Sequence, residues 1–485
     1  MTKANGMTDT GNAANVKKWI LDTLDSETFA YSNNGTAVEN QLQDMDLNYY
    51  MPDTVTYLSR SDWKATWPKT YKDLTATDEM IEVMKNDLVE IKEQGNPDEV
   101  TFGEDNGLTL ASLKGETDLT NEKWTDLIDQ ITLEEAMIRT GFGGTSTKSI
   151  VSIVSPEAVQ NDGPNGFNSY TLGQYANTDT DSADPYVIDP DDKNLNYKFG
   201  TMSNETVIAQ TFSKEMAAEY GAVTGIIPSG QIFQSSRGAG TNLHRTPYNA
   251  RNHEYYSEDS MLTNLMGVAV CTGGTSKGLM MTPKHFAFNN MELNRSGLST
   301  FMTEQAGREM ELRGFQGAMQ KNVAKGIMTA FNRVGTVFAG ADEGVQTQIA
   351  RNEWGYTGWI VTDMINGADY MNWKDSLLGG GGTMLSNPTT YEDTEWGAMT
   401  SDKNMKKIKA DSLFQHKMKE ILKTYVYTTA QSNAMNGISA GTQIVYVNTW
   451  WQNLIVGIKY AFGALTVILV VLYLVSLKKN GKEKE

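Results

Sequence analysis

The sequence predicts an α/β protein of the TIM-like (β/α)8 barrel type, preceded by a linker with the remnant of a β-domain and followed by one transmembrane helix. From Leu108 onward, helical patterns alternate with short apolar runs over roughly 300 residues, which is about the size of such a barrel. Three of the runs begin with glycine and are mainly apolar, as is typical of parallel strands buried on both faces. A long uncharged segment lies near the C-terminus and predicts the membrane helix.

The net charge and the numbers of cysteines and histidines exclude several classes of function. The 485 residues carry a net charge of −18, which argues against a nucleic-acid binder, because such proteins present a basic surface. A single cysteine, Cys271, excludes an intrachain disulfide and a four-cysteine zinc site. The four histidines show neither an HExxH motif nor metal-ligand spacing, and no P-loop or strand-linked GxGxxG turn occurs. We therefore expect no metal and no cofactor.

Residues 1–107 are rich in polar residues, and their composition varies along the segment. The spacing of apolar residues predicts a helix over Thr77–Glu93, with Thr77 or Asp78 as its N-cap. The remaining text, including NYYMPDTVTYLSRSDW, is typical of strand ends and linker. We interpret 1–107 as a linker and the remnant of a preceding β-domain.

Residues 108–432 are expected to form the barrel. Amphipathic helices are predicted for NEKWTDLIDQITLEEAMI and NETVIAQTFSKEMAAEYGAVTG, and another helical stretch precedes the run GIMTAF. Buried strands are predicted at four places: 150–154, 278–282, 326–331 and 358–362. A doubly wound sheet is the alternative, but its phosphate-binding glycine turn is missing.

An acidic stretch interrupts this region at 177–193. A calcium loop is one interpretation, but the stretch lacks the glycine and the terminal glutamate of an EF-hand. A solvated insertion is the better interpretation.

The C-terminal segment predicts a membrane anchor. Residues 461–477 carry no charge, and Trp450, Trp451 and Tyr460 are aromatic residues that favour the membrane interface. The span 450–477 is long enough to cross a hydrocarbon core of about 30 Å. The lysines of 478–485 place this tail in the cytoplasm and the barrel outside the cell, with 433–449 as a juxtamembrane linker. The alternative is a buried C-terminal helix, which rarely needs such a long uncharged run.

Reactive residues of a (β/α)8 barrel stand at the carboxyl ends of its strands. The predicted strands are followed by polar residues: Asp162, Lys284–His285, Asn332–Arg333 and Asp363. Taken singly, an aspartate after a strand is more often a helix cap or a turn residue. Together they suit a polyhydroxylated substrate, because charged groups bind sugar hydroxyls and one carboxylate can face the anomeric carbon.

Five sequence strings resemble the barrel domain of glycoside hydrolase family 3: NDGPNGF, RNHEYYSED, KHFAFNNMELNR, AFNRVGTVFAGA and NEWGYTGWIVTD. They occur in the family's order and together cover roughly 108–430. The likeness is strongest to members with reversed domain order, in which the barrel comes last and some chains end in a membrane helix.

The resemblance implies a retaining exo-acting β-glycosidase, in the first place a β-glucosidase, whose partner is a β-linked oligosaccharide or glucoside. Asp363 matches the family's nucleophile, and four further residues match its sugar-binding positions: Asp162, Arg251, Lys284 and His285. Residues within the same motifs are implied to support the wall of the site: His253, Glu254, Asn289, Glu292 and Arg295. Lys284 and Arg251 are expected to help keep Asp363 ionised.

Two departures from the family bear on activity. Most members draw the general acid/base from an α/β sandwich domain, and 1–107 are too few residues for one, so we expect a missing or separate domain to supply it. The sequence MINGADYMN after Asp363 lacks the aromatic residue that often follows the nucleophile, which predicts a changed aglycone preference. The alternative function is a membrane-anchored sugar-binding or inactive barrel protein.

Overall fold

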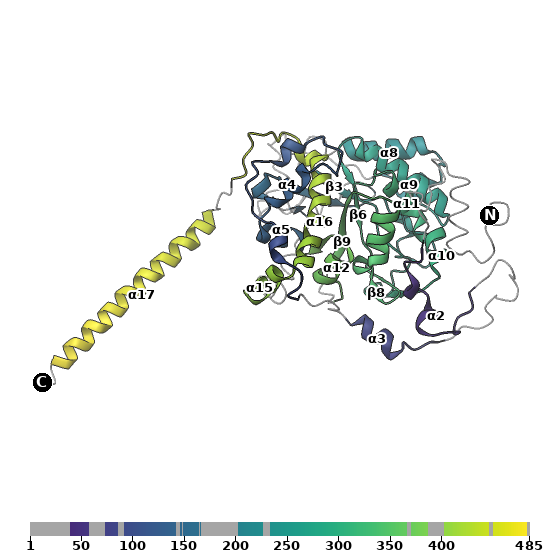
Figure 1. Cartoon of the computed structure of the whole chain (residues 1–485). Coiled ribbons are helices and arrows are strands. Elements are labelled where there is room, and N and C mark those ends of the chain that lie inside the picture. Colours follow the sequence, from purple (N-terminus) through teal and green to yellow (C-terminus); the bar gives the residue numbers. More distant parts are fainter. Residues whose placement is uncertain are drawn as a thin grey trace, which may run out of the picture. The chain divides into compact units, whose positions relative to one another are not determined.

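The computed structural model describes residues 39–57, 73–85, 92–141, 146–147, 149–163, 165, 202–226, 233–365, 370–386, 402–445 and 450–482. The chain divides into two compact units, Met1–Thr442 and Gln443–Glu485. The first contains all the described strands, and the second consists of the helix α17 (Figure 1).

Six parallel strands follow one another in sequence order across the first unit: β2 (Ala158–Asp162), β3 (Phe233–Arg237), β4 (Met280–Met281), β6 (Gly326–Met328), β9 (Trp359–Ile365) and β10 (Thr383–Ser386). A parallel bridge between Phe286 and Thr329 joins the β4 side to the β6 side. Sequential parallel strands are the arrangement on which a (β/α)8 barrel is built. The described pairings form an open run of strands, so ring closure is not among them.

Shorter strands lie beside this run. β1 (Ser146–Thr147) pairs antiparallel with β2. A separate small sheet consists of β5 (Ser299–Thr300), β7 (Arg333–Val334) and β8 (Val337–Phe338). Within it, β7 and β8 form an antiparallel hairpin, and β5 runs parallel to β7.

Three of the predicted buried strands are confirmed as β4, β6 and β9. Ile327 and Val361 are fully buried, which explains why these strands show no alternation of apolar and polar residues. The prediction of a strand at 150–154 is wrong. Val151–Ile153 is a 3-10 turn that ends at Val154 with φ of 54°, and the strand that follows is β2, which Asp162 itself closes.

Helices lie on both sides of the strands in Figure 1. The α-helices are α4 (Lys123–Asp129), α5 (Leu133–Gly141), α7 (Glu205–Ala209), α8 (Lys214–Ile226), α9 (Ser260–Thr275), α10 (Glu304–Ala306), α11 (Arg313–Gln320), α12 (Trp373–Gly379), α15 (Asp402–Ala410) and α16 (Ser412–Ala430). Two π-helical stretches are η6 (Gly307–Glu311) and η8 (Gly344–Glu353). Short 3-10 turns are η2 (Pro97–Glu99), η3 (Leu110–Leu113), η4 (Val151–Ile153), η5 (Asn252–Glu254), η7 (Ala339–Ala341) and η9 (Asn433–Met435).

Two helices that were predicted as continuous are each broken. Between α4 and α5, the side-chain amide of Gln130 hydrogen-bonds the backbone N–H and C=O of Leu108, at 2.7 and 2.8 Å. Between α7 and α8, Phe212 adopts a left-handed conformation with φ of 51°. Apolar spacing within one segment does not report such breaks, because one depends on a distant backbone partner and the other on a local turn.

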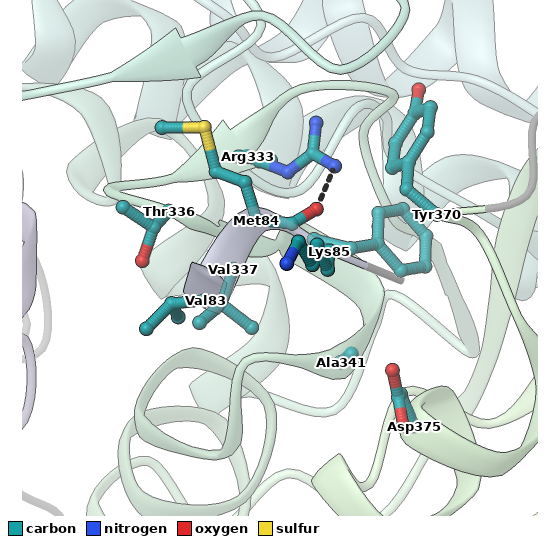
Figure 2. Close-up of a pocket in the computed structure, with 10 residues that line it drawn as sticks. Val83, Met84, Lys85, Arg333, Thr336, Val337, Ala341, Tyr370 and Asp375 are labelled. Carbon is teal, nitrogen blue, oxygen red and sulfur yellow. Dashed lines mark hydrogen bonds between the residues drawn. The ribbon is translucent and has the colours of Figure 1, made fainter. Parts of the chain in front are cut away.

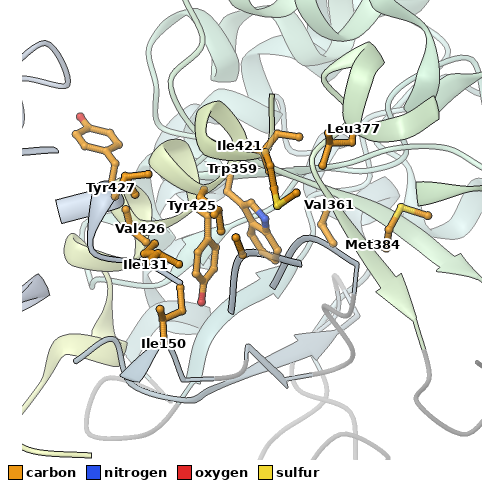
Figure 3. Packing of buried hydrophobic residues seen from close by; sticks show 14 of the residues in the cluster. Ile131, Ile150, Trp359, Val361, Leu377, Met384, Ile421, Tyr425, Val426 and Tyr427 are labelled. Carbon is orange, nitrogen blue, oxygen red and sulfur yellow. The ribbon is translucent and has the colours of Figure 1, made fainter. Parts of the chain in front are cut away.

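The largest apolar cluster packs around β9 and α16 (Figure 3). Trp359 and Val361 of β9 meet Ile421 and Tyr425 of α16, with Ile131 beside them. Burying a side chain of this size contributes about 1.5–3 kcal/mol. This cluster therefore fixes β9, the strand that contains Asp363.

The described residues before Leu108 pack against the same unit. Leu42 and Met45, the latter in the turn η1 (Gln43–Met45), belong to a buried cluster with Phe286 and Ile360. No strand occurs among the described residues of 39–107. Where strand ends were expected, Leu47–Tyr50 forms the helical turn α2, whose cap is Asp46.

The predicted helix at Thr77 is confirmed at its start and shorter than expected. α3 spans Asp78–Met84, and the Thr77 hydroxyl caps it by accepting from the N–H of Met80. Residues 58–72 and 86–91 lie outside the described residues, as does the acidic stretch 177–193.

α17 (Trp450–Lys482) forms the second unit. Within Trp450–Lys478, an 18-residue window has a mean hydropathy of 2.3. By length and composition α17 is the one helix in the described part of the chain that can cross a membrane.

Candidate active site

Polar side chains gather at the carboxyl ends of three strands. Asp162 is the last residue of β2, Lys284 and His285 follow β4, and Asp363 lies in the second half of β9. Because these strands are parallel, their carboxyl ends share one edge of the sheet. Residues up to two hundred positions apart in the sequence thus meet at one place.

Asp363 is buried, and its two oxygens have different surroundings. Oδ1 accepts from the backbone N–H of Met364 at 2.7 Å. Oδ2 makes no hydrogen bond within the described structure and lies 3.4 Å from His285 Nε2. Burial raises the pKa of Asp363 to about 6, although the Met364 N–H, Lys284 and Arg251 all act to lower it. The pKa of Asp363 thus lies nearer to neutrality than that of an ordinary aspartate, and Oδ2 is buried without a hydrogen bond in the described structure.

Lys284 is buried between two acidic side chains. Its Nζ lies 3.0 Å from Asp162 Oδ1 and 3.8 Å from Glu254 Oε2. Burial disfavours the ammonium form, but Asp162 and then Glu254 outweigh it, so the pKa of Lys284 is raised above its ordinary value. Lys284 thus presents a fixed positive charge beside Asp363.

His285 is held as a neutral imidazole. Burial, followed by Arg251 and Lys284, lowers its pKa well below the ordinary value. Arg251 Nη2 lies 3.2 Å from Nε2, and the Tyr255 hydroxyl lies 3.3 Å from Nδ1. Asn289 Nδ2 also lies 3.3 Å from Nδ1, so donor groups approach both nitrogens of the neutral imidazole.

The supporting residues form a continuous ionic network, with one exception. Arg251 pairs with Glu254 and lies 3.5 Å from Glu292 Oε1. Glu292 also accepts from Asn289 Nδ2 at 3.2 Å and pairs with Arg295 at 3.0 Å. The structure therefore brings four of the five residues to the site.

His253 is the exception. Its side chain is exposed, and the contact it makes is through its backbone carbonyl, which lies 3.5 Å from the Thr206 hydroxyl. Both residues belong to the turn η5, but the neighbouring Glu254 is buried and contacts Lys284, whereas the His253 side chain is exposed.

Three residues at the site were not found by reasoning from the sequence. Asn242 holds the backbone of His285 by accepting from its N–H at 2.6 Å and donating to its C=O at 3.0 Å. Tyr255 fixes the imidazole. Glu205 is buried next to the Gly240 N–H, and burial raises its pKa well above the ordinary value. A glutamate in a helix's first turn and an asparagine in a loop give no sequence signal for such contacts.

The arrangement can bind and attack a polyhydroxylated molecule. Buried cations and carboxylates give charge-assisted hydrogen bonds to hydroxyl groups, and Asp363 Oδ2 is available as a nucleophile. Within the described residues, no group of three or more histidine, cysteine or acidic side chains is placed to hold a metal ion.

Comparisons with known proteins agree with this geometry. Residues 240–375 match the glycosyl hydrolase family 3 N-terminal domain. A beta-glucosidase from Ruminococcus albus is 37% identical over 163 residues, which cover 34% of this chain and 17% of that protein. Beta-glucosidase 3B from Thermotoga neapolitana, solved in complex with alpha-D-glucose, is 26% identical with a TM-score of 0.52, covering 63% of this chain and 43% of that one.

A beta-glucosidase from Paenibacillus barengoltzii shares the fold at 22% identity, with a TM-score of 0.57 over 78% of this chain and 38% of that one. Each match thus spans less than half of the relative's length. The described parallel strands have the order of a TIM-type barrel, and the matched residues include Lys284, His285 and Asp363. Residues 240–375 of the chain therefore form a glycoside hydrolase family 3 N-terminal domain, similar to those of beta-glucosidases.

Proposed function

We propose that this chain belongs to a retaining exo-acting β-glycosidase, a β-glucosidase, in which Asp363 forms a covalent glycosyl-enzyme. The observation that supports it most is the buried Asp363 carboxylate, with Oδ1 fixed by a backbone N–H and Oδ2 unbonded within the described structure. The beta-glucosidase relatives and the glucose complex of a solved neighbour favour a glucoside as the substrate.

The proposed reaction has two steps. Asp363 Oδ2 attacks the anomeric carbon, and the bond to the aglycone oxygen breaks as that oxygen takes a proton from a general acid. Water then attacks the same carbon, gives its proton to the base and frees the carboxylate. Asp162, Lys284 and His285 bind sugar hydroxyls, and Arg251 contacts the sugar and steadies the site. We assign the acid/base to a separate or missing α/β sandwich domain.

We also propose that α17 anchors the protein in a membrane, with the tail 478–485 in the cytoplasm and the barrel outside the cell. The apolar span and the lysines of the tail support this orientation. Replacing Asn480 with cysteine tests it, since the native Cys271 is buried and therefore poorly reactive. The new thiol should react in intact cells with a membrane-permeant maleimide and stay unlabelled by an impermeant one. Labelling by the impermeant reagent would reverse the orientation.

The reaction is tested by comparing two β-glucosides on the full chain in detergent, one with a dinitrophenyl and one with an alkyl leaving group. A dinitrophenolate leaves without protonation, so it requires only the nucleophile. We expect release of dinitrophenolate by the wild type, none by Asp363→Ala, and little reaction with the alkyl glucoside. Normal turnover by Asp363→Ala would overturn the assignment.

The second function, a membrane-anchored sugar-binding protein, is favoured by the ionic network itself, which can hold hydroxyl groups without reacting. It predicts saturable glucose binding in calorimetry together with no dinitrophenolate release. The two functions thus give different results in the same pair of measurements.

A further inference from the structure

Arg333 occupies a junction outside the ionic network of the site. It begins β7, a few residues beyond the carboxyl end of β6, and its backbone N–H donates to the C=O of Leu298 at 2.8 Å. The strand β7 lies between β5 and β8, so Arg333 belongs to the small sheet that flanks the parallel strands.

The Arg333 side chain joins three segments that are far apart in the sequence, at Met84, Gly297 and Tyr370; Figure 2 shows the first and the last of these beside Arg333. Nη2 donates to the C=O of Met84, the last residue of α3, at 3.0 Å. Nη1 donates to the C=O of Gly297 at 2.9 Å, and the guanidinium lies over the Tyr370 ring at 4.5 Å from its centre. The residue is buried, which lowers the pKa of its guanidinium, yet the two carbonyls and the ring compensate the charge.

Two of these segments lead directly to the candidate site. Gly297 stands two residues after Arg295, whose guanidinium lies 4.3 Å from the centre of the Phe331 ring and pairs with Glu292. The Tyr370 hydroxyl donates to the C=O of Phe331 at 2.8 Å. Arg333 therefore holds both the loop that bears Arg295 and the segment on which Arg295 rests.

The same hairpin is held on its other side by the N-terminal segment. The Tyr50 hydroxyl is 2.8 Å from the Thr336 hydroxyl. Gly335 has a φ of 55° and approaches Asp44 so closely that a Cβ at 335 would lie 2.5 Å from the Asp44 carbonyl oxygen. Residues before the predicted barrel thus contact the turn between β7 and β8 as well as Arg333.

We propose that Arg333 is a positioning residue that couples the N-terminal helix α3 to Arg295 and Glu292, which support the sugar-binding wall of the site. The proposal rests on the proposed function, because it assigns the wall to sugar binding. The fork geometry of arginine is required: lysine is a point donor that cannot reach two carbonyls while lying flat on a ring. Sequence upstream of the barrel then affects the site without touching the substrate.

The chain offers a matched control in Arg351. This arginine also donates to two backbone carbonyls, those of Tyr356 at 2.9 Å and Gly358 at 2.6 Å, and lies over the Tyr356 ring at 5.0 Å. Gly358 precedes β9, so Arg351 stands at the end of that strand opposite to Asp363. Arg333→Lys and Arg351→Lys remove the same type of interaction at opposite ends of the fold.

The first measurement is the rate of glycosyl-enzyme formation by the full chain with a 2-deoxy-2-fluoro β-glucoside of dinitrophenol, followed by mass spectrometry. Misplacing a binding group by about 1 Å can cost about 100-fold, so we expect Arg333→Lys to slow trapping at least ~10-fold. Arg351→Lys should stay within about 2-fold of the wild type, because it lies outside the positioned wall. Equal rates for the two variants would overturn the proposal.

The second measurement is amide hydrogen exchange of 78–85 and 295–300 in the same proteins, with and without glucose. Without sugar, Arg333→Lys should speed exchange in both segments, whereas Arg351→Lys should not. With glucose, 78–85 should become more protected in the wild type and not in Arg333→Lys, since coupling between two places is reciprocal. Unchanged exchange in 295–300 of Arg333→Lys would overturn the proposal.

Failure of the proposed function gives a different result. A wild type that forms no adduct and binds no glucose contradicts the glycosidase assignment. The sugar-free exchange data still decide whether Arg333 ties α3 to the Arg295 loop, and a loss of protection in only one of the two segments contradicts that coupling.

Discussion

The two ends of β9 bury charge in opposite ways. Near the carboxyl end, Asp363 lies beside the neutral imidazole of His285, and the neighbouring Lys284 pairs with Asp162. At the other end, Arg139 is fully buried over the Tyr425 ring at 3.7 Å and near Trp359 at 5.8 Å. In the part of the chain described here, none of its three guanidinium nitrogens has a hydrogen-bond partner.

This difference separates charges placed among opposite charges from a charge that is compensated by the Tyr425 and Trp359 side chains. A buried ion offsets its desolvation when partners surround it, and it is expensive when they do not. At the carboxyl end the network also fixes the geometry in which Asp363 Oδ2 stays unbonded. Substitutions at that end should therefore change reactivity first, and substitutions of Arg139 should change stability alone.

The largest expected effect belongs to Asp363→Asn, which keeps the shape and removes the nucleophile. Trapping of the glycosyl-enzyme should fall by about 1,000-fold or more. The free energy of unfolding of Asp363→Asn should instead rise. The folded carboxyl holds its proton up to about pH 6 and the unfolded one to 3.8, so its charge reduces stability as pH rises through that window.

Asp363→Asn removes this penalty and should raise the free energy of unfolding at pH 7 by up to about 3 kcal/mol. Denaturant unfolding at pH 4 and pH 7 measures it, with the larger gain at pH 7. A variant that is both unreactive and strongly destabilised would contradict the separation between the two ends.

Lys284→Met ranks second, because it leaves Asp162 and Glu254 without their shared cation. Loss of charge-assisted hydrogen bonds to sugar hydroxyls should lower kcat/KM for a dinitrophenyl glucoside roughly 100-fold. This corresponds to a loss of about 2–3 kcal/mol of transition-state stabilisation. Lys325→Met is a control. The Lys325 ammonium donates to Gln431 Oε1 at 3.1 Å, and its removal breaks no ion pair described here. Equal effects of both variants would show that Lys284 has no special role.

The carboxyl end of β9 was the more predictable of the two. Burial on both faces leaves an unbroken apolar run, so the strand and the aspartate in it can be seen in the sequence. Lys284 and His285 follow the same logic after β4. The residues that hold His285 in place, Asn242 and Tyr255, come from a separate loop, and their role depends on contacts that no local pattern records.

The amino end was less predictable. Arg139 falls in an amphipathic helical pattern, where an arginine ordinarily faces solvent, and only the packing of α16 covers it. The break at Gln130 has a similar cause, because its partner Leu108 lies outside the helix pattern. What escapes the sequence in both cases is the identity of a distant neighbour.

The third effect is the pH dependence of the first chemical step. Asp363 must be ionised to attack, and its pKa is about 6, so the rate with the dinitrophenyl glucoside should fall about tenfold per unit well below that pH. Lys284 acts to lower this pKa, so Lys284→Met should move the acid limb to higher pH. An unmoved limb would indicate that another group controls it.

The smallest effect on activity is expected for Arg139→Met. Methionine fills a similar space among Trp359 and Tyr425 without a charge, and replacing an unpaired buried ion should raise the free energy of unfolding by about 1–3 kcal/mol, even after loss of the contact with the Tyr425 ring. Glycosyl-enzyme trapping should stay within about 2-fold of the wild type, because Arg139 lies at the end of β9 away from Asp363.

Arg308→Met is the matched control for the direction of this change in the free energy of unfolding. Arg308 is buried too, but it bonds Glu304 at 2.8 Å and both oxygens of Glu353 at 2.5 and 3.0 Å. Its loss leaves Glu353 and Glu304 without their shared cation, while Glu304 still accepts from the N–H groups of Gln41 and Leu42, and should cost about 3–5 kcal/mol. Denaturant unfolding of the two variants should thus move in opposite directions from the wild type. If Arg139→Met destabilises the protein as Arg308→Met does, the charge at the amino end of β9 has a compensating role, and the contrast between the two ends of the strand is wrong.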